Sequence, residues 1–221
     1  MMDKVLEKLS LQRMVCPWWC CYTFDNPLRK LLHNPEAILS PYIRPGCTAI
    51  DVGAGMGYFS IPLARLVGPA GHVTAIDIQV KMLEALARRA RKHGVSERIK
   101  PYLANSDSLG NHSKADFVIA FWMVHEVPNK RAFLTEIFGF LKPEGLFLLA
   151  EPIFHVSKKS FLRTLNIANE IGFTLKDMPR ICLSRSVLLA RNQSGNDRSI
   201  LQGRHNDRPA GDAQTQVRGE I

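Results

Sequence analysis

Apolar residues between positions 46 and 152 follow two alternating patterns. A short apolar run that ends in glycines predicts a buried strand at 48–52, and further strands are predicted at 72–76, 99–103, 117–121 and 145–150. Longer stretches with apolar residues every three or four positions predict helices at 58–67, 79–92 and 130–141. Strands that alternate with helices of this length form βαβ units. The pattern therefore predicts an α/β fold built on a mostly parallel sheet.

The end of the patterned region departs from this alternation. A helix is expected at about 160–171, because Gly172 follows the last apolar position of that stretch. Two further strands, 173–178 and 186–190, are separated only by a short polar link. Such a link indicates an antiparallel hairpin at the edge of the sheet. With the hairpin, the prediction is a seven-stranded sheet with helices on both faces.

Three parts of the chain can be distinguished by composition. Residues 1–45 form an N-terminal helical and aromatic segment, and residues 46–191 form the α/β domain. Residues 192–221 are polar and have almost no apolar periodicity. We expect this tail to be disordered, because it offers too little apolar surface to offset the entropy of ordering it.

Charge raises the question of nucleic acid. The 221 residues carry a net charge of +9, and residues 88–93 form the basic run RRARKH. Cations are favoured at the C-terminal end of a helix, so the run is expected to be a solvated helix end. A phosphate-binding patch is the alternative. No aromatic residues interleave with the run to stack on bases, which argues against a nucleic-acid partner.

The cysteines and the apolar runs indicate the compartment. Five cysteines are an odd number, and Cys16, Cys20 and Cys21 crowd one short segment, unlike a disulfide framework. Their spacing also lacks the paired pattern of a zinc site, so we expect no metal. No run of 18 apolar residues is present, and charges interrupt the N-terminal apolar positions. We therefore expect a cytoplasmic protein without a membrane span.

A glycine-rich loop joins the first strand to its helix. Gly53, Gly55 and Gly57 stand at alternate positions, where they allow a tight turn and close approach of a ligand to the backbone. A dinucleotide fingerprint would require a third glycine where Tyr58 stands. Asp77, at the end of the second strand, is placed to accept bonds from ribose hydroxyls. An acid just before the loop, Asp51, suits a ligand with an ammonium or sulfonium charge.

Four motifs in order resemble those of class I S-adenosylmethionine-dependent methyltransferases. They are AIDVGAGMG at 49–57, AID at 75–77, DFVIAF with VHE at 116–126, and LKPEGLFLLAEP at 141–152. The resemblance covers about residues 45–191 and is greatest to the small-molecule branch that includes ubiquinone and menaquinone methyltransferases. It implies a Rossmann-like fold and S-adenosylmethionine as the cofactor.

The resemblance also implies roles by position. The glycine loop would pack against the methionine part of the cofactor, with Asp51 near its amino group and Asp77 on its ribose. Asn105 stands where relatives carry an acid directed at the adenine amine, and an amide oxygen can also accept that bond. The implied cofactor-binding residues are Asp51, Gly53, Ala54, Gly55, Gly57, Asp77, Ile78, Asn105, Ser106 and Phe121.

The acceptor side is less strongly marked. His125 follows the fourth strand, at the edge where open α/β sheets bind ligands, and it is the candidate general base. Trp122 and Glu126 are expected to line the acceptor pocket. The alternative is that His125 only caps or packs the next helix.

An aromatic run supplies a second candidate for the acceptor side. Trp18, Trp19 and Tyr22 lie ahead of the first motif, where residues in this family often form a lid. We expect them to give the pocket a water-excluding wall. A helix packed on the flank of the sheet is the alternative.

The leading hypothesis is methyl transfer to a small, hydrophobic or aromatic acceptor. The alternatives are an RNA or protein methyltransferase, a non-catalytic module that binds S-adenosylmethionine and acts through a partner, and a nicotinamide-dependent dehydrogenase. Tyr58 in the dinucleotide position argues against the last. Nothing in the sequence indicates an oligomeric state.

The tail gives a first testable expectation. Deleting residues 192–221 is expected to leave the melting temperature and the cofactor affinity nearly unchanged, because the tail offers little apolar surface for packing. Differential scanning calorimetry of the shortened chain measures the first quantity and titration calorimetry the second. A fall of many degrees in the melting temperature would contradict the expectation.

Overall fold

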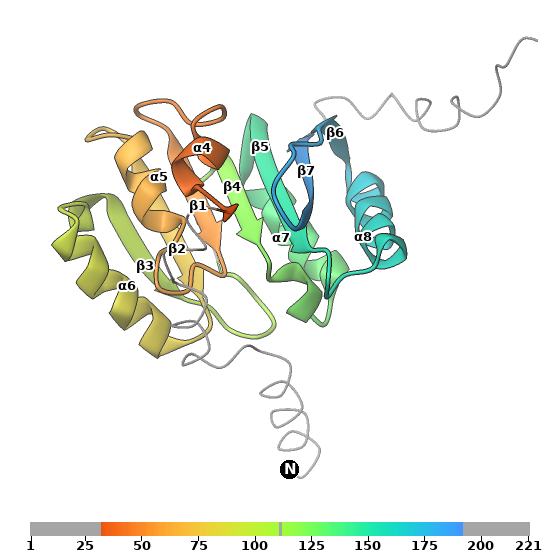
Figure 1. Ribbon diagram of the computed structural model, residues 1–221, viewed down its shortest axis with the longest axis horizontal. Helices are drawn as coiled ribbons and strands as arrows, with labels where there is room; N and C mark the ends of the chain where they lie inside the picture. The colour runs from red at the N-terminus through yellow and green to blue at the C-terminus, as the bar shows by residue number, and fades with distance from the viewer. Residues whose placement is uncertain (1–31, 111, 192–221) are drawn as a thin grey trace, which may run out of the picture.

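A computed structural model of the protein describes residues 32–110 and 112–191. Within them a seven-stranded sheet has the strand order β3-β2-β1-β4-β5-β7-β6 (Figure 1). The strands are β1 (Thr48–Val52), β2 (His72–Asp77), β3 (Ile99–Leu103), β4 (Ala115–Phe121), β5 (Leu141–Pro152), β6 (Phe173–Asp177) and β7 (Ser184–Arg191). This is the predicted Rossmann-like sheet. Trp18, Trp19 and Tyr22, with Cys16, Cys20 and Cys21, lie outside the described residues.

Two late strands complete the sheet in an order that the sequence does not reveal. β1 to β5 pair in parallel, whereas β7 runs antiparallel to both β5 and β6. β7 inserts between β5 and β6, so the hairpin partner β6 forms the edge. A short link joins adjacent antiparallel strands, which accounts for the correct pairing within the hairpin. The long pairing of β7 with β5, from Leu146↔Ala190 to Pro152↔Ser184, fixes β7 as an inner strand.

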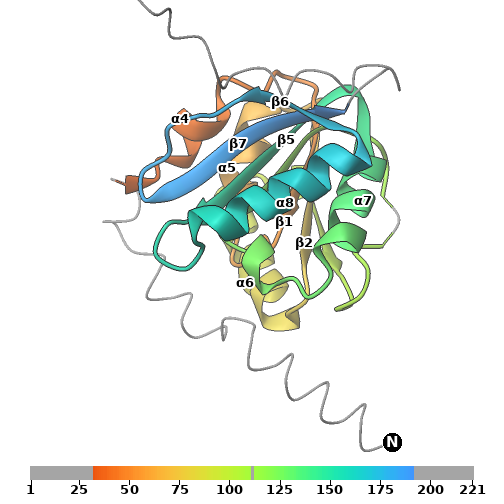
Figure 2. The same ribbon diagram turned by 90° about the vertical axis from the view of Figure 1, so that its right-hand side faces the viewer.

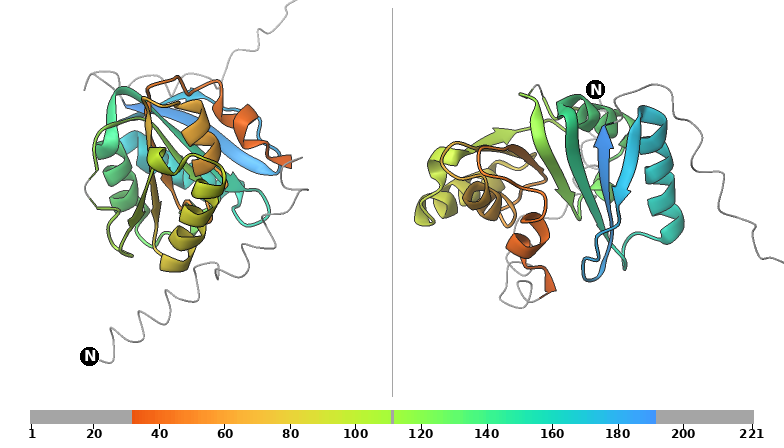
Figure 3. Two further views of the ribbon diagram at one scale, coloured as in Figure 1. Left: turned by 90° about the vertical axis from the view of Figure 1, so that its left-hand side faces the viewer. Right: turned by 90° about the horizontal axis from the view of Figure 1, so that it is seen from above.

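Helices cover both faces of the sheet, as predicted (Figures 2 and 3). Side chains that alternate along β4 point to opposite faces: Phe117 and Ile119 belong to one core cluster, and Val118 belongs to the other. α4 (Pro35–Leu39), α5 (Ser60–Leu66) and α6 (Val80–Lys92) pack on the first face. α7 (Lys130–Phe140) and α8 (Lys158–Ile171) pack on the second. Burial on both faces explains why the inner strands β4 and β5 carry long apolar stretches.

The carboxyl ends of β1, β2, β4 and β5 meet at one edge of the sheet, where short elements follow the strands. The glycine loop follows β1, and the 3₁₀ turn η2 (Val124–Glu126) follows β4. A second 3₁₀ turn, η1 (Ser96–Arg98), precedes β3 on the amino side. The loops at the carboxyl edge are therefore the ones positioned to form a ligand site.

Candidate active site

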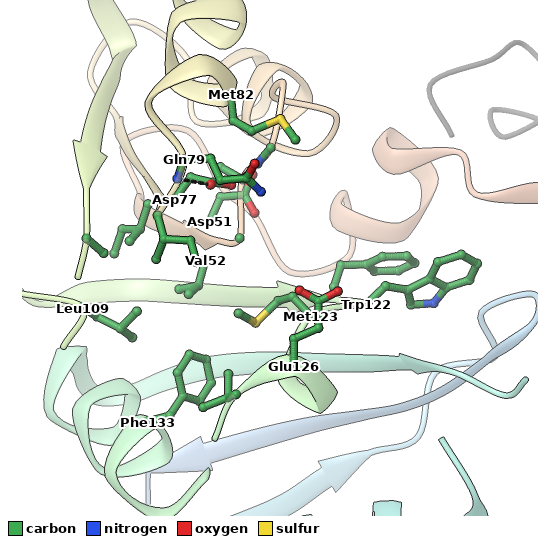
Figure 4. Close-up of a pocket in the computed structure, with 18 of the residues that line it drawn as sticks. Asp51, Val52, Asp77, Gln79, Met82, Leu109, Trp122, Met123, Glu126 and Phe133 are labelled. Carbon is green, nitrogen blue, oxygen red and sulfur yellow. Dashed lines mark hydrogen bonds between the residues drawn. The ribbon is translucent and has the colours of Figure 1, made fainter. Parts of the chain in front are cut away.

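A cavity of about 600 Å³ opens at this carboxyl edge. Its walls come from the ends of β1, β2 and β4, the loop after β3, η2 and the segment after β5. Figure 4 shows Asp51, Asp77 and Gln79 on one side, with Met123 and Glu126 facing them from the β4 side. Such a volume and position are typical of cofactor and small-molecule sites.

At two glycines of the loop, backbone without a side chain lines the cavity. Gly53 and Gly55 have φ values of 73° and 53°, in the left-handed region that side chains rarely adopt. A Cβ at Gly53 would lie 2.8 Å from Cγ of Met123, so a side chain there has no room. At Gly55 a Cβ meets no heavy atom of the described residues within 4 Å. The space beside the Cα atom of Gly55 therefore belongs to the cavity. A ligand bound there could approach the backbone closely.

Not all of the loop faces the ligand space. Gly57 does not line the cavity, and a Cβ there would lie 3.1 Å from Cγ of Leu86 on α6. Close packing of the loop on that helix explains why position 57 is a glycine. Ala54, Gly53 and Gly55 do line the cavity.

A methyl group at Gly55 tests whether the cavity holds the cofactor. Gly55→Ala is expected to weaken S-adenosylmethionine binding by at least about tenfold, about 1.4 kcal/mol, because the new Cβ occupies ligand space rather than protein space. Gly94→Ala is the matched control, since Gly94 also has a positive φ (66°) and open surroundings but lies just beyond the end of α6. Both variants carry similar backbone strain, of about 1–2 kcal/mol. Equal cofactor affinities for the two variants, measured by titration calorimetry, would remove the loop from the site.

Asp77 is a buried carboxylate at the cavity wall, only 8% exposed. One of its oxygens accepts from the Gly55 amide and the other from the Gln79 amide, each at 2.8 Å. Burial raises the pKa of Asp77 above its ordinary value, and these backbone hydrogen bonds oppose that shift. The side chain is thus held rigidly between the glycine loop and the end of β2. Each oxygen keeps lone-pair capacity for a ligand hydroxyl.

Asp51 connects the glycine loop to the helix that follows it. It is 2% exposed, and it accepts a hydrogen bond of 2.5 Å from the Ser60 hydroxyl in the first turn of α5. The same residue lines the cavity. It therefore anchors the loop to α5 and also places a carboxyl group at the ligand space.

The loop after β3 forms the far end of the cavity. Asn105 and Ser106 line it, and the backbone N–H of Asn105 donates to the Ser108 carbonyl at 3.1 Å. Glu136 on α7 holds this loop by accepting from the Leu109 amide at 2.8 Å and the Ser108 hydroxyl at 3.1 Å. Ile78, 44% exposed, contributes an apolar wall next to Asp77. The predicted cofactor residues here are thus brought together.

On the β4 side, aromatic rings form a cluster at the cavity mouth. Phe121 and Trp122 line the cavity, and the Trp122 indole N–H donates to the Ser184 hydroxyl at 2.9 Å. Trp122 has a positive φ of 58°, a strained conformation for a bulky residue that is often found at functional sites. The Phe154 ring, exposed and also lining the cavity, packs edge-on against Trp122 at 5.3 Å.

His33 supports this cluster from the N-terminal side. Its ring packs edge-on against Trp122 at 4.9 Å, and Nε2 lies 2.6 Å from the Cys182 carbonyl. The segment that leads into α4 is therefore tied to the mouth of the cavity. No sequence pattern pointed to His33 or Phe154, because the contact between His33 and Cys182 spans 149 positions.

His125 and Glu126, the candidate base and a candidate pocket residue, both line the cavity. Nδ1 of His125 lies 2.9 Å from Oε2 of Glu151, a β5 residue that is 3% exposed. The Glu151 side chain holds the pKa of His125 above its ordinary value, and partial burial opposes the shift. His125 therefore lies at the cavity wall and is held there by Glu151, a position that a general base requires.

Metal and membrane features can be assessed for the same part of the chain. Among residues 32–110 and 112–191, no three His, Cys, Asp or Glu side chains are grouped to hold a metal ion. None of the helices described there is both long and apolar enough to cross a membrane.

Comparison with known proteins decides the family. A family described as a methyltransferase domain matches residues 43–197. The chain belongs to this family. The match covers more than half of the chain, and together with the sheet described above it identifies a methyltransferase domain with a Rossmann-like fold.

The chain is similar in sequence to curated proteins. Ubiquinone/menaquinone biosynthesis C-methyltransferases of Brucella canis and Brucella anthropi are 35% and 33% identical over 117 residues. Those alignments cover 52% of this chain and 43% or 44% of the relatives. The chain thus aligns with less than half of the length of the curated relatives it matches.

Solved structures share the fold. An S-adenosylmethionine-dependent methyltransferase from Aquifex aeolicus superposes with a TM-score of 0.71 at 22% identity, over 80% of this chain and 98% of that one. Fibrillarin from Aeropyrum pernix, solved with natively bound S-adenosyl-L-methionine, superposes with a TM-score of 0.55 at 16% identity, over 70% of this chain and 72% of that one. At these identities the similarity concerns the fold alone.

Proposed function

We propose that the methyltransferase transfers a methyl group to a small aromatic, hydroxyl-bearing acceptor, and that His125 is its general base. The supporting observation is that the cofactor wall and the His125 side belong to one cavity. The names of the relatives, which refer to ubiquinone and menaquinone biosynthesis, agree with the aromatic mouth formed by Trp122 and Phe154.

The cofactor lobe of the cavity is assigned to the residues that line it. Asp77 holds the ribose hydroxyls, Asp51 faces the amino group of the methionine part, and the backbone of the glycine loop packs along that part. Asn105 and Ser106 bind the adenine end, and Ile78 and Phe121 supply apolar walls. This assignment is supported by the burial of both acids at the cavity and by the room that Gly55 leaves for a ligand.

Bound S-adenosylmethionine supplies an electrophilic methyl group on a sulfonium. An acceptor held in line with that carbon would form a bond to it as the S–C bond breaks, and the electron pair of the broken bond would stay on sulfur. His125 takes the hydroxyl proton of the acceptor as electron density moves toward the attacking atom. When a hydroxyl oxygen attacks, this proton loss completes the transfer; when a ring carbon attacks, that carbon then loses its own proton and the hydroxyl is re-formed, so that the aromatic ring is restored. Such base catalysis contributes about 10²- to 10⁴-fold, and holding the two reactants in line contributes about 7–11 kcal/mol in favourable cases.

The acceptor lobe is assigned to the aromatic cluster and to the N-terminal run. Trp122 and Glu126 line it in the cavity, and Trp18, Trp19 and Tyr22 are proposed to complete its wall. The described chain begins at Leu32, which is exposed and lies next to His33 at the mouth. A run that ends some ten residues earlier is within reach of that mouth, since an extended residue spans about 3.3–3.6 Å.

We place the enzyme in the cytoplasm, without a nucleic-acid partner.

An acceptor assay tests this proposal. The full chain is incubated with methyl-labelled S-adenosylmethionine and either short-chain benzoquinols and naphthoquinols, total RNA, or a denatured protein extract. Label transferred to a quinol, with the mass increase of one methyl group, is the expected result. Transfer only to RNA or to protein would replace the proposal by the macromolecular alternative. Cofactor binding without transfer to any of the three would favour a non-catalytic binding module.

A further inference from the structure

Glu151 occupies an unusual place for an acid. It stands near the end of β5 and is 3% exposed, yet the proposed reaction assigns it no part. Its Oε1 accepts from the Val124 amide at 2.9 Å, and its Oε2 accepts from the His125 amide at 3.1 Å. Oε2 also lies 2.9 Å from Nδ1 of His125. One buried carboxylate therefore holds both the backbone and the ring of the proposed base.

This geometry favours one ring nitrogen of His125 as the carrier of the proton when Glu151 is an ionised carboxylate. Backbone amides always donate, so both oxygens of Glu151 act as acceptors. The third contact is then a donation from the Nδ1–H of His125 to Oε2. Nε2 is left as the acceptor nitrogen of the neutral ring. An acid that fixes the tautomer and orientation of a histidine is a recurring arrangement in enzymes that use histidine as a base.

We propose that Glu151 is the positioning residue of the general base: it holds the proton of neutral His125 on Nδ1, which leaves Nε2 to take the proton of the acceptor. The inference rests on the proposed role of His125. It assigns a catalytic consequence to an acid that is two elements away from η2 in the chain.

Other charged groups around His125 are few in the described residues. Glu126 adds a second negative charge and Lys130 a positive one, and the His155 ring lies edge-on at 5.8 Å between centroids. The Glu151 contact is the largest influence on the pKa of His125, and it raises that pKa. The neutral, basic form of His125 therefore accumulates only as the pH rises through this raised pKa. Removing the Glu151 charge moves the transition to lower pH.

The first test follows His125 by NMR in the full-length protein labelled with ¹⁵N at the histidine rings. In the wild type the ring is expected to be protonated at Nδ1 when neutral, and to titrate at higher pH than histidine in a short unstructured peptide. In Glu151→Gln the titration is expected to move to lower pH, and the neutral ring is expected to populate both tautomers. A wild-type His125 that titrates at or below the peptide histidine, or is protonated at Nε2 when neutral, would overturn the inference even if no variant folds.

The second test separates positioning from a purely structural role. In Glu151→Gln the plateau of kcat is expected to fall at least about tenfold, and the acidic limb of the pH profile to move to lower pH by the shift seen in NMR. Glu151→Asp, which keeps the charge, is expected to restore most of the NMR shift. Asp116→Asn is the matched control, because Asp116 also accepts from a backbone amide, that of Thr48, and pairs with Lys142 at the other end of β4. It is expected to leave the titration of His125 unchanged.

The readouts distinguish the two proposals. An unmoved NMR titration in a folded Glu151→Gln overturns the inference about Glu151, whatever the activity. A moved titration with an unmoved acidic limb overturns the role of His125 as the base and, with it, the catalytic part of the inference. Parallel movement of both supports the two together.

Discussion

Replacing Asp77 by alanine is expected to weaken S-adenosylmethionine binding about 10- to 100-fold while the fold is kept. A hydrogen bond to a charged group contributes about 1.5–3 kcal/mol, and each 1.4 kcal/mol is a factor of about ten in Kd. The loss is larger than for an exposed acid, because Asp77 is buried and held in place by the Gly55 and Gln79 amides. Titration calorimetry gives the affinity, and circular dichroism reports whether the sheet is intact.

Asp177→Ala is the matched control for this prediction. Asp177 also ends a strand, β6, but it is exposed and does not line the cavity. Its replacement is expected to leave the affinity unchanged. Equal affinities for the wild type and Asp77→Ala would exclude Asp77 from the ribose site, and the glycine loop would then need another ligand partner.

Replacing His125 by asparagine is expected to lower kcat by about 10²- to 10⁴-fold, the range of a lost general base. The affinity for S-adenosylmethionine is expected to change little, because the ring lies on the acceptor side of the cavity. Asparagine keeps a short polar group near Glu151, so η2 retains its amide bonds to that carboxylate. The acidic limb of the pH profile is also expected to disappear, since the group whose pKa is raised has been removed.

His72→Asn provides the comparison for His125→Asn. His72 is exposed at the start of β2, at the amino edge of the sheet and away from the cavity. Its replacement is expected to leave kcat unaltered. If His125→Asn keeps most of its activity, alignment of the reactants alone accounts for the rate and the cavity needs no base.

Local patterns explain why most of the sheet could be predicted. The run at 117–121 is continuous and apolar, and the run at 48–52 is mostly so, because β4 and β1 are buried on both faces. Boundaries were less accurate where the chain continues through a turn. β5 was expected from 145 but begins at Leu141, because Leu141 already pairs with Ala115 of β4 ahead of an irregular register.

The insertion of β7 beside β5 had no local signal. A short link predicts that β6 and β7 pair with each other, but it does not say which of them reaches β5. That choice depends on the packing of Val187 and Leu189 in the same cluster as Phe147 and Leu149. Such contacts join positions some 40 residues apart and do not appear in any single window of sequence.

The two halves of the site also differ in how far the sequence could reveal them. Asp51, Gly55 and Asp77 lie within two neighbouring strand–loop units, so their order and spacing predicted that they would meet at one edge of the sheet. Glu151 follows an apolar run and could be taken for an exposed acid at a strand end. Only the fold shows that two backbone N–H groups of η2 and Nδ1 of His125 converge on it.

The assignment of the cavity to the methyl donor is tested most directly by calorimetric titration of the full-length protein with S-adenosylmethionine and, separately, with NAD and NADP. Saturable binding of S-adenosylmethionine to one site per chain with a micromolar Kd, and no binding of either nicotinamide cofactor, is the predicted result. Binding of NAD or NADP, or no binding of S-adenosylmethionine, would contradict the assignment.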